Sequence, residues 1–343
     1  MTPPDSPSDK PPRRPRYRGR NPRQFHEKYK EHAPLRFADD VAKVLDSGKT
    51  PAGMHRPIMV REILEILSPQ PGETAVDCTL GYGGHARELL AAVQPGGRLL
   101  AVDADPLELP KTEARLRELG HPPESLVVKR MNYAGVAQWL ATEAPDGVDV
   151  LLADLGLSSM QLDDPARGFT YKADGPLDMR MNPTRGPSAA DLLTKLDVEA
   201  LSQTLADNAD EPQAETLAVA ILRAQQRRPL VTTQQLAEVV RSAVTDDDAV
   251  RRVFQAIRIA VNDEFGALDA FLRQLPQCLK LGGRVAILSF HSGEDRRVKQ
   301  AFKDGLRTGA YRDIAPEVVR PSPEEQRANP RSSSAKLRFA VRH

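Results

Sequence analysis

Two acidic residues and a glycine-rich turn are the features of this chain that most clearly suggest chemistry. A short apolar segment runs into Val76-Asp-Cys-Thr-Leu-Gly-Tyr-Gly-Gly-His85, and a second apolar segment ends in Asp103, 20 residues after Gly83. Glycines allow a backbone to approach a ligand closely, and an acid at the tip of the second strand can accept hydrogen bonds from a ribose diol. The turn alone is equally consistent with a simple tight turn, whereas the turn together with Asp103 favours a ligand site.

The spacing of the glycines narrows the choice of ligand. The turn reads Gly81-x-Gly83-Gly84, which departs from the Gly-x-Gly-x-x-Gly fingerprint of dinucleotide-binding folds. S-adenosylmethionine (SAM) carries a ribose but no pyrophosphate, so a SAM site fits this turn as well as a site for a nicotinamide dinucleotide does. A dehydrogenase is the alternative interpretation, and failure to bind NAD would exclude it.

Strand and helix patterns alternate in the first half of the chain. Strands separated by helices of about ten residues predict a parallel sheet with right-handed crossovers. The predicted helices are Pro57–Leu67, Ala86–Val93, Leu107–Leu119 and Tyr133–Thr142, and the predicted strands are Thr74–Cys78, Arg98–Asp103, Ser125–Lys129 and Val148–Asp154.

The alternation stops after the fourth strand, and no convincing strand follows between Asp163 and about Leu275. The apolar spacing in this region predicts helices alone, with Thr232–Thr233 as an N-cap for one of them. We then expect the sheet to resume and to end in a hairpin-like edge strand. The predicted helices are Ala189–Lys195, Val198–Ala206, Gln213–Arg227, Gln234–Val244 and Ala249–Leu275, and the later strands are Arg284–Ser289 and Ala335–Val341.

We therefore predict an α/β fold in which a helical domain is inserted into one sheet. Residues 51–162 and 276–343 form the cofactor-binding domain, and residues 163–275 form the insert. Residues 1–50 are predicted to be a disordered basic tail, because a segment rich in proline and arginine buries too little apolar surface to fold alone.

Charge is distributed unevenly along the chain. Residues 1–36 contain ten Lys and Arg against four Asp and Glu, whereas the remainder contains 38 against 43, within a total net charge of +1. The tail is interpreted either as an arm for RNA phosphates or as a passive extension.

No apolar run is long enough to span a membrane, and the N-terminus lacks the apolar segment of a secretory signal. Cys78 and Cys278 have no metal-ligand spacing, so we expect buried free thiols in a reducing cytosol and no metal site.

Several longer motifs closely resemble one family, the bacterial ribosomal RNA small-subunit methyltransferase H family (RsmH or MraW). The resemblance covers about Met54 to Arg342, in the order of the family throughout. The matching segments are Val150–Asp164, Arg167–Tyr171, Asp174–Met181, Phe254–Ile259, Val261–Glu264 and Leu288–Arg296.

This resemblance implies a Rossmann-like class I SAM-dependent methyltransferase. The enzyme would methylate N4 of one cytidine in the decoding region of 16S ribosomal RNA, within the small ribosomal subunit and in the cytoplasm. A catalytically inactive RNA-binding assembly factor on the same fold is the alternative. The oligomeric state is left open, with a homodimer as one option.

The resemblance also carries over individual residues. Gly83, Gly84 and His85 match the family's Gly-Gly-His at the methionine end of SAM, and Asp103 matches its ribose-binding acid. Further cofactor contacts are implied for residues that lie in or after later strands, namely Tyr133, Asp154 and Gln161. Tyr133 fits adenine stacking and a core position almost equally well.

Two interpretations are open for each of three further residues in the matching motifs. Arg180, together with Asp178, could hold a substrate phosphate or lock its own loop. His291 could face the base or cap a turn, and the charged run that begins at Glu294 is interpreted as a solvated helix start. Asp178, Arg180 and His291 are predicted as substrate-binding residues.

The proton acceptor cannot be named from the sequence. Many amino-methyltransferases use Asp/Asn-Pro-Pro-aromatic, but this chain has Asp154-Leu-Gly-Leu157 and retains only the acid. Asp154 and His291 are the catalytic candidates. A second departure from the family is Asp207–Thr216, which lacks expected basic groups and leaves the RNA contacts of the insert in doubt.

Overall fold

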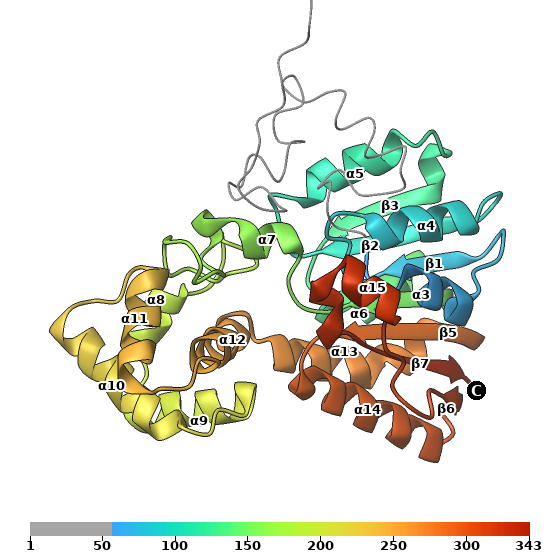
Figure 1. Cartoon of the computed structure of the whole chain (residues 1–343). Helices are drawn as coiled ribbons and strands as arrows, with labels where there is room; N and C mark the ends of the chain where they lie inside the picture. The colour runs from blue at the N-terminus through green and yellow to red at the C-terminus, as the bar shows by residue number, and fades with distance from the viewer. Residues whose placement is uncertain (1–56) are drawn as a thin grey trace, which may run out of the picture. The chain divides into compact units, whose positions relative to one another are not determined.

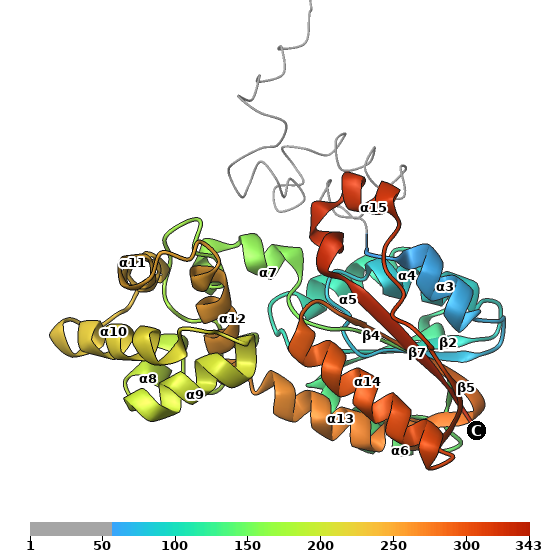
Figure 2. The same cartoon turned by 60° about the horizontal axis from the view of Figure 1, so that its bottom comes forward.

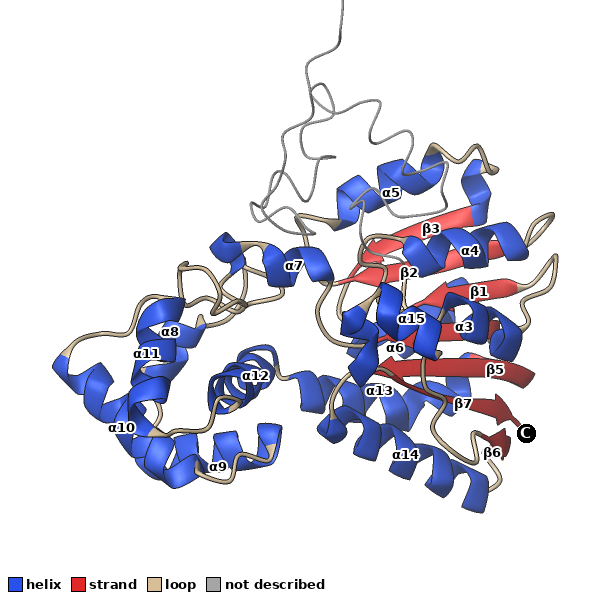
Figure 3. Ribbon diagram, viewed as in Figure 1, coloured by secondary structure: helices blue, strands red, loops and turns tan. Residues whose placement is uncertain are grey.

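The computed structural model describes residues 57–343, and the predicted tail lies outside this range. Seven strands form one sheet in the order β3-β2-β1-β4-β5-β7-β6 (Figures 1 and 3). Strands β1 to β5 are parallel, while β7 runs antiparallel to both β5 and β6. The predicted Rossmann-like sheet is therefore confirmed. The strands are β1 Thr74–Asp77, β2 Arg98–Asp103, β3 Leu126–Arg130, β4 Val148–Asp154, β5 Leu279–Ser289, β6 Tyr311–Ile314 and β7 Lys336–Arg342.

Helices cover both faces of the sheet because each central strand buries apolar side chains on both sides. One apolar core packs β1, β4 and β5 against α6, α13 and α14, which lie together along one face in Figure 2. A second core lies on the opposite face, beneath α3 and α4. The helices of this part are α3 Val60–Leu67, α4 Gly84–Ala92, α5 Leu109–Arg117, α6 Val136–Glu143, α7 Ser159–Asp163, α13 Glu264–Cys278, α14 Ser292–Arg307 and α15 Pro323–Ala328.

A third apolar core belongs to the region between β4 and β5, which is helical as predicted and contains no named strand among the described residues. Its helix α11 begins at the predicted cap, where Thr232 accepts from the Gln235 backbone N–H in a capping box. The helices of this part are α8 Ala189–Leu193, α9 Val198–Ala209, α10 Ala214–Arg227, α11 Thr233–Ala243 and α12 Ala249–Asn262.

The prediction of one helix over Ala249–Leu275 is wrong. The chain breaks at Asp263, which adopts a left-handed conformation with φ of 47°, so that α12 ends and α13 begins. Gly266 permits this break, because a Cβ there would clash with the Asp263 carboxylate. Helix α12 packs in the helical core and α13 in the sheet core, and we therefore propose that the inserted domain ends near residue 263 in place of 275.

The C-terminal region also differs from the expectation. The last strand is not an edge strand, because β7 lies between β5 and β6. The edge strand β6 and the short helix α15 lie in the segment 310–330, where the sequence analysis predicted neither a strand nor a helix. Strand β6 has four residues and two of them are exposed, which gives it little of the apolar alternation that marks a strand.

Candidate functional site

Three carboxylates meet where the parallel strands end. Asp77, Asp103 and Asp154 are the last residues of β1, β2 and β4, which are neighbours in the sheet. The carboxyl ends of parallel strands share one edge, and ligands of open α/β sheets bind outside that edge. This edge is therefore the candidate site.

Asp103 is held by the backbone of the adjoining loops. One carboxylate oxygen accepts from the Gly81 N–H at 2.7 Å and the other accepts from the Asp105 N–H at 2.8 Å. Burial raises the pKa of Asp103 even though these N–H bonds lower it. Each oxygen retains a second lone pair, so the carboxylate is fixed in place and can still accept hydrogen bonds from a ribose diol.

The glycine-rich turn opens helix α4 directly above β1. Gly83 is the N-cap, with φ of 79°, and a Cβ there would lie 2.9 Å from Thr112 Cγ2. At Gly84 a Cβ would lie 2.7 Å from Pro57 Cγ. Both positions therefore exclude larger residues, and the turn places His85 in the first turn of the helix.

His85 links this turn to Asp154. Its Nε2 lies 2.9 Å from the Ile58 carbonyl oxygen and therefore donates, while Nδ1 lies 3.5 Å from Asp154 Oδ2. Burial lowers the pKa of His85, so the neutral ring is favoured. The neutral ring then directs the lone pair of Nδ1 toward the Asp154 carboxyl group, which brings together two residues that the sequence had predicted separately.

Asp154 is a strongly perturbed acid of the site. Burial, followed by the negative charge of Glu294, raises the pKa of Asp154 to about 7. Its Oδ1 is buried and has no hydrogen-bond partner among the described residues. Asp77, the acid that follows the first apolar segment of the sequence, lies beside it, and burial raises the pKa of Asp77 to about 6. An unpartnered buried acceptor at the strand edge can receive a proton or a hydrogen bond from a ligand.

Gln161 and Tyr133 are anchored within the protein. The Gln161 carbonyl accepts from the Ser158 N–H, and its Nε2 donates to Asp105 at 2.8 Å. The Tyr133 ring packs edge-on against Phe271, with 5.5 Å between the ring centroids. This half-buried packing gives Tyr133 the core position that the sequence left open, and its contact with adenine remains a prediction.

Arg180 makes the contacts of a loop lock. Its guanidinium donates two hydrogen bonds to Asp178, at 2.8 and 2.7 Å, and one to the Gly186 carbonyl. Burial opposes ionisation of Asp178, but hydrogen bonds from Arg180 outweigh it and lower the pKa. Asn262, at the end of α12, fixes the same loop by accepting from Met181 and donating to Met179. A phosphate-binding role for Arg180 remains a prediction.

His291 is the N-cap of α14. Its Nδ1 accepts from the Glu294 N–H, and its Nε2 lies 3.3 Å from Glu294 Oε1. The interpretation of Glu294 as a solvated residue is wrong, because only 3% of it is exposed. Glu294 lies near Glu264, whose two oxygens accept from Arg258 at 2.8 and 2.9 Å.

The sequence analysis missed this buried ion-pair group, Arg258–Glu264–His291–Glu294. All four residues lie in motifs that match the family, so the sequence did mark them. Residue spacing predicts contacts only within one helix, strand or turn, and these residues come from segments far apart in the chain. Ligand atoms of Glu264, His291 and Glu294 lie within 4.8 Å of one another. The guanidinium of Arg258 already bonds both oxygens of Glu264, and so it supplies the positive charge that a metal ion would otherwise provide.

The acidic segment that departed from the family pattern has a structural contact. Asp210, the C-cap of α9, accepts from Arg296 and from Ser292, both in α14. The segment therefore links the helical region to the helix that begins at the site.

The family model of the MraW methylase family matches residues 52–343. The chain belongs to this family. The ribosomal RNA small subunit methyltransferase H 2 of Alkaliphilus metalliredigens is 48% identical over 349 residues, covering 98% of this chain and 99% of the relative. The corresponding methyltransferase H 1 of Lachnoclostridium phytofermentans is 46% identical and covers 96% and 93%. A methyltransferase H of Rubrobacter xylanophilus is 43% identical and covers 85% and 96%.

Family membership agrees with the class I methyltransferase sheet, whose cofactor is SAM. Among solved structures, a SAM-dependent O-methyltransferase of Thermotoga maritima covers 88% of this chain and 71% of its own length. Its identity is 12% and its TM-score is 0.39, a likeness too low to inform function.

Both cysteines are buried and free, as predicted. Within residues 57–343, no helix is long and apolar enough to cross a membrane.

Proposed function

We propose that this protein transfers a methyl group from SAM to N4 of one cytidine in the decoding region of 16S ribosomal RNA. The observation that carries the proposal is the pairing of Asp154 with His85 beside the glycine-rich turn, with Asp154 Oδ1 left without a partner. The names of the relatives supply the substrate class, because they specify RNA of the small ribosomal subunit. We place the activity on the small subunit in the cytoplasm.

The residues at the strand edge fit SAM. The proposal assigns the fixed carboxylate of Asp103 to the ribose hydroxyls, and Gly83 and Gly84 leave the start of α4 without side chains for the methionine end of SAM. Asp77 and Asp154 add carboxyl groups that favour a positively charged ligand. When bound, SAM supplies an electrophilic methyl group on a positively charged sulfur for in-line displacement by the base amine. The chain itself must hold that amine in line and remove its proton.

Asp154 is the proton acceptor in this proposal. The amine of cytosine is a poor nucleophile because its lone pair is conjugated with the ring, and an acceptor at its proton localises that lone pair. Asp154 Oδ1 is free for this contact, while Oδ2 faces Nδ1 of His85. A carboxyl group whose pKa is about 7 can take up a proton near neutral pH and release it again.

His85 orients this acceptor. The hydrogen bond of its Nε2 to Ile58 fixes the ring, and the ring in turn limits how Asp154 can rotate. His291, the other candidate, is better suited to a structural role. Its Nδ1 lone pair already accepts from the backbone of Glu294, and its Nε2 faces the Glu294 carboxylate.

The test uses the whole chain, labelled SAM and small ribosomal subunits that lack the modification. Mapping should place the label on N4 of one cytidine of the decoding region. Label on another nucleotide would overturn the assigned substrate. Tight binding of the subunits without any transfer would favour the inactive assembly factor. The target base must leave its stack to reach the strand edge, so free duplex RNA should be a poor substrate.

A further inference from the structure

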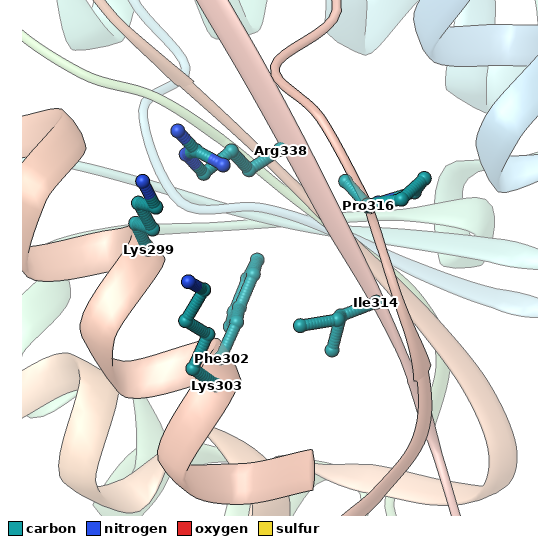
Figure 4. Close-up of a pocket in the computed structure, with 7 residues that line it drawn as sticks. Lys299, Phe302, Lys303, Ile314, Pro316 and Arg338 are labelled. Atoms are coloured by element: carbon teal, nitrogen blue, oxygen red, sulfur yellow. The ribbon is translucent and has the colours of Figure 1, made fainter.

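Three positively charged side chains gather beside the outer part of the sheet. Lys299 and Lys303 of α14 and Arg338 of β7 line a small pocket (Figure 4). Its remaining wall is apolar and consists of Phe302, Ile314, Ala315 and Pro316. Figure 4 shows the ends of the three cationic side chains on one side of this wall.

The cluster is built on a rigid base. Arg338 is 8% exposed and donates to Asp295 at 2.7 and 3.3 Å, which ties β7 to the first turn of α14. Lys299 and Lys303 are exposed and lie four residues apart, hence on one face of the helix. Neither ammonium group contacts a carboxylate within residues 57–343, so two uncompensated charges project beside a buried ion pair.

The strand register relates Arg338 to the candidate site. Asp154 of β4 pairs with Leu288 of β5, and Leu288 pairs with Leu337 of β7, the neighbour of Arg338. Two strand spacings amount to about 10 Å. Helix α14 begins at the same edge of the sheet with His291 as its cap, and at 1.5 Å per residue Lys299 and Lys303 lie about 11 and 17 Å along it from that edge.

We propose that Lys299 and Lys303 bind phosphates of the RNA strand that flanks the target cytidine, with Arg338 supporting the same surface. This inference rests on the proposed function. Residues 37–343 contain fewer Lys and Arg than Asp and Glu, 38 against 43, so the chain outside its basic tail has no general attraction for a polyanion. Within residues 37–343, phosphate contacts then depend on local cationic surfaces, and this one lies along the helix that begins at the edge of the sheet where Asp154 lies.

Single-stranded RNA fits the cluster better than an acidic protein segment does. The two ammonium groups are point charges of the kind that contact phosphates without reading sequence. The apolar wall beside them offers a surface for a ribose or an unstacked base, and the target cytidine must itself be unstacked to react.

The test compares the double variant Lys299→Gln/Lys303→Gln with the control Lys111→Gln/Arg117→Gln. The control removes two exposed charges from α5, which packs on β3 at the opposite edge of the sheet. Binding to small subunits lacking the modification is measured between about 0.05 and 0.3 M salt. Over this range the Debye length, the distance over which charges interact, falls about twofold. Two lost phosphate contacts should lower the slope of log affinity against log salt by about 1.4 and weaken binding at 0.1 M roughly 25-fold.

The kinetic expectation is a higher KM for the subunit with little change in kcat, because the acceptor and the cofactor residues are untouched. SAM affinity and thermal stability should match those of the unaltered chain, which shows that the variant is folded. An unchanged salt slope and KM in the α14 variant would overturn the inference while leaving the proposed function intact. An equal loss in the α5 control would also overturn it. Absence of methyl transfer by the unaltered chain would instead contradict the proposed function.

Discussion

Replacing Asp154 with asparagine should make the fold more stable and nearly abolish methyl transfer. Asparagine keeps the shape of the side chain but cannot ionise, so the cost of a buried charge disappears. The folded protein raises the pKa of Asp154 from 3.8 to about 7. At about 1.4 kcal/mol per pH unit, this shift corresponds to at most about 4 kcal/mol of destabilisation when the group is ionised. The side chain remains 28% exposed, and water on that side should reduce the effect to about 2 kcal/mol.

The pH dependence follows from the direction of the shift. Because the pKa is higher in the folded state, that state binds the extra proton between about pH 4 and pH 7, and stability falls as the pH rises through this range. The Asp154→Asn variant lacks this loss. The free energy of unfolding in urea should therefore be equal for the two proteins at pH 4, and about 2 kcal/mol higher for the variant at pH 8. The negative charge of Asp154 also helps to raise the pKa of Asp77 to about 6, so Asp77 should titrate at lower pH in the variant and add to its greater stability at pH 8.

The same substitution removes the proposed proton acceptor. Turnover of small subunits at pH 8 should fall roughly 10²- to 10⁴-fold, the usual contribution of a general base. In the unaltered chain kcat/KM should rise with pH through about 7, because the acceptor must be ionised to act. Asp146→Asn, at an exposed turn before β4, is the matched control and should leave both measurements unchanged. A variant with equal stability differences at pH 4 and pH 8, or with normal turnover, would refute the reasoning.

Asp103→Ala removes a charge-assisted hydrogen bond to the ribose worth about 1.5–3 kcal/mol, and calorimetry should show a 10- to 150-fold loss of SAM affinity. Wild-type affinity in a folded variant would exclude this role. Arg258→Met leaves Glu264 buried without its partner, so urea unfolding should show a loss of about 3–5 kcal/mol. Removal of residues 1–36 should lower the salt slope of RNA binding and preserve both SAM affinity and the methylated position, whereas an identical slope would make the tail a passive extension.

The sequence determined the parts of the fold that depend on local patterns. Each of β2 and β4 ends in an acid after an apolar run, and parallel strands separated by helices must bring those acids to one edge. The start of α11 was likewise predictable, since Thr232 and Gln235 form a capping box within four residues. The roles assigned to Asp103, Asp154 and the other site residues come from the family resemblance and remain predictions.

Only the tertiary structure decided the contacts between distant segments. The break at Asp263 is invisible to helical periodicity, because the apolar stripe continues across it while the two halves pack in different cores. The burial of Glu294 depends on α13 covering the start of α14, and a charged run by itself predicts solvent exposure. Strand β7 became internal because β6 pairs with its free edge.

The electrostatics of the site depend on the same distant contacts. The pKa of Asp154 is raised by burial among strands and by a glutamate 140 residues away, neither of which a local motif encodes. Residue type and spacing therefore determined which groups reach the strand edge. Packing across the sheet decided which of them is charged, which is paired and which is left free to react.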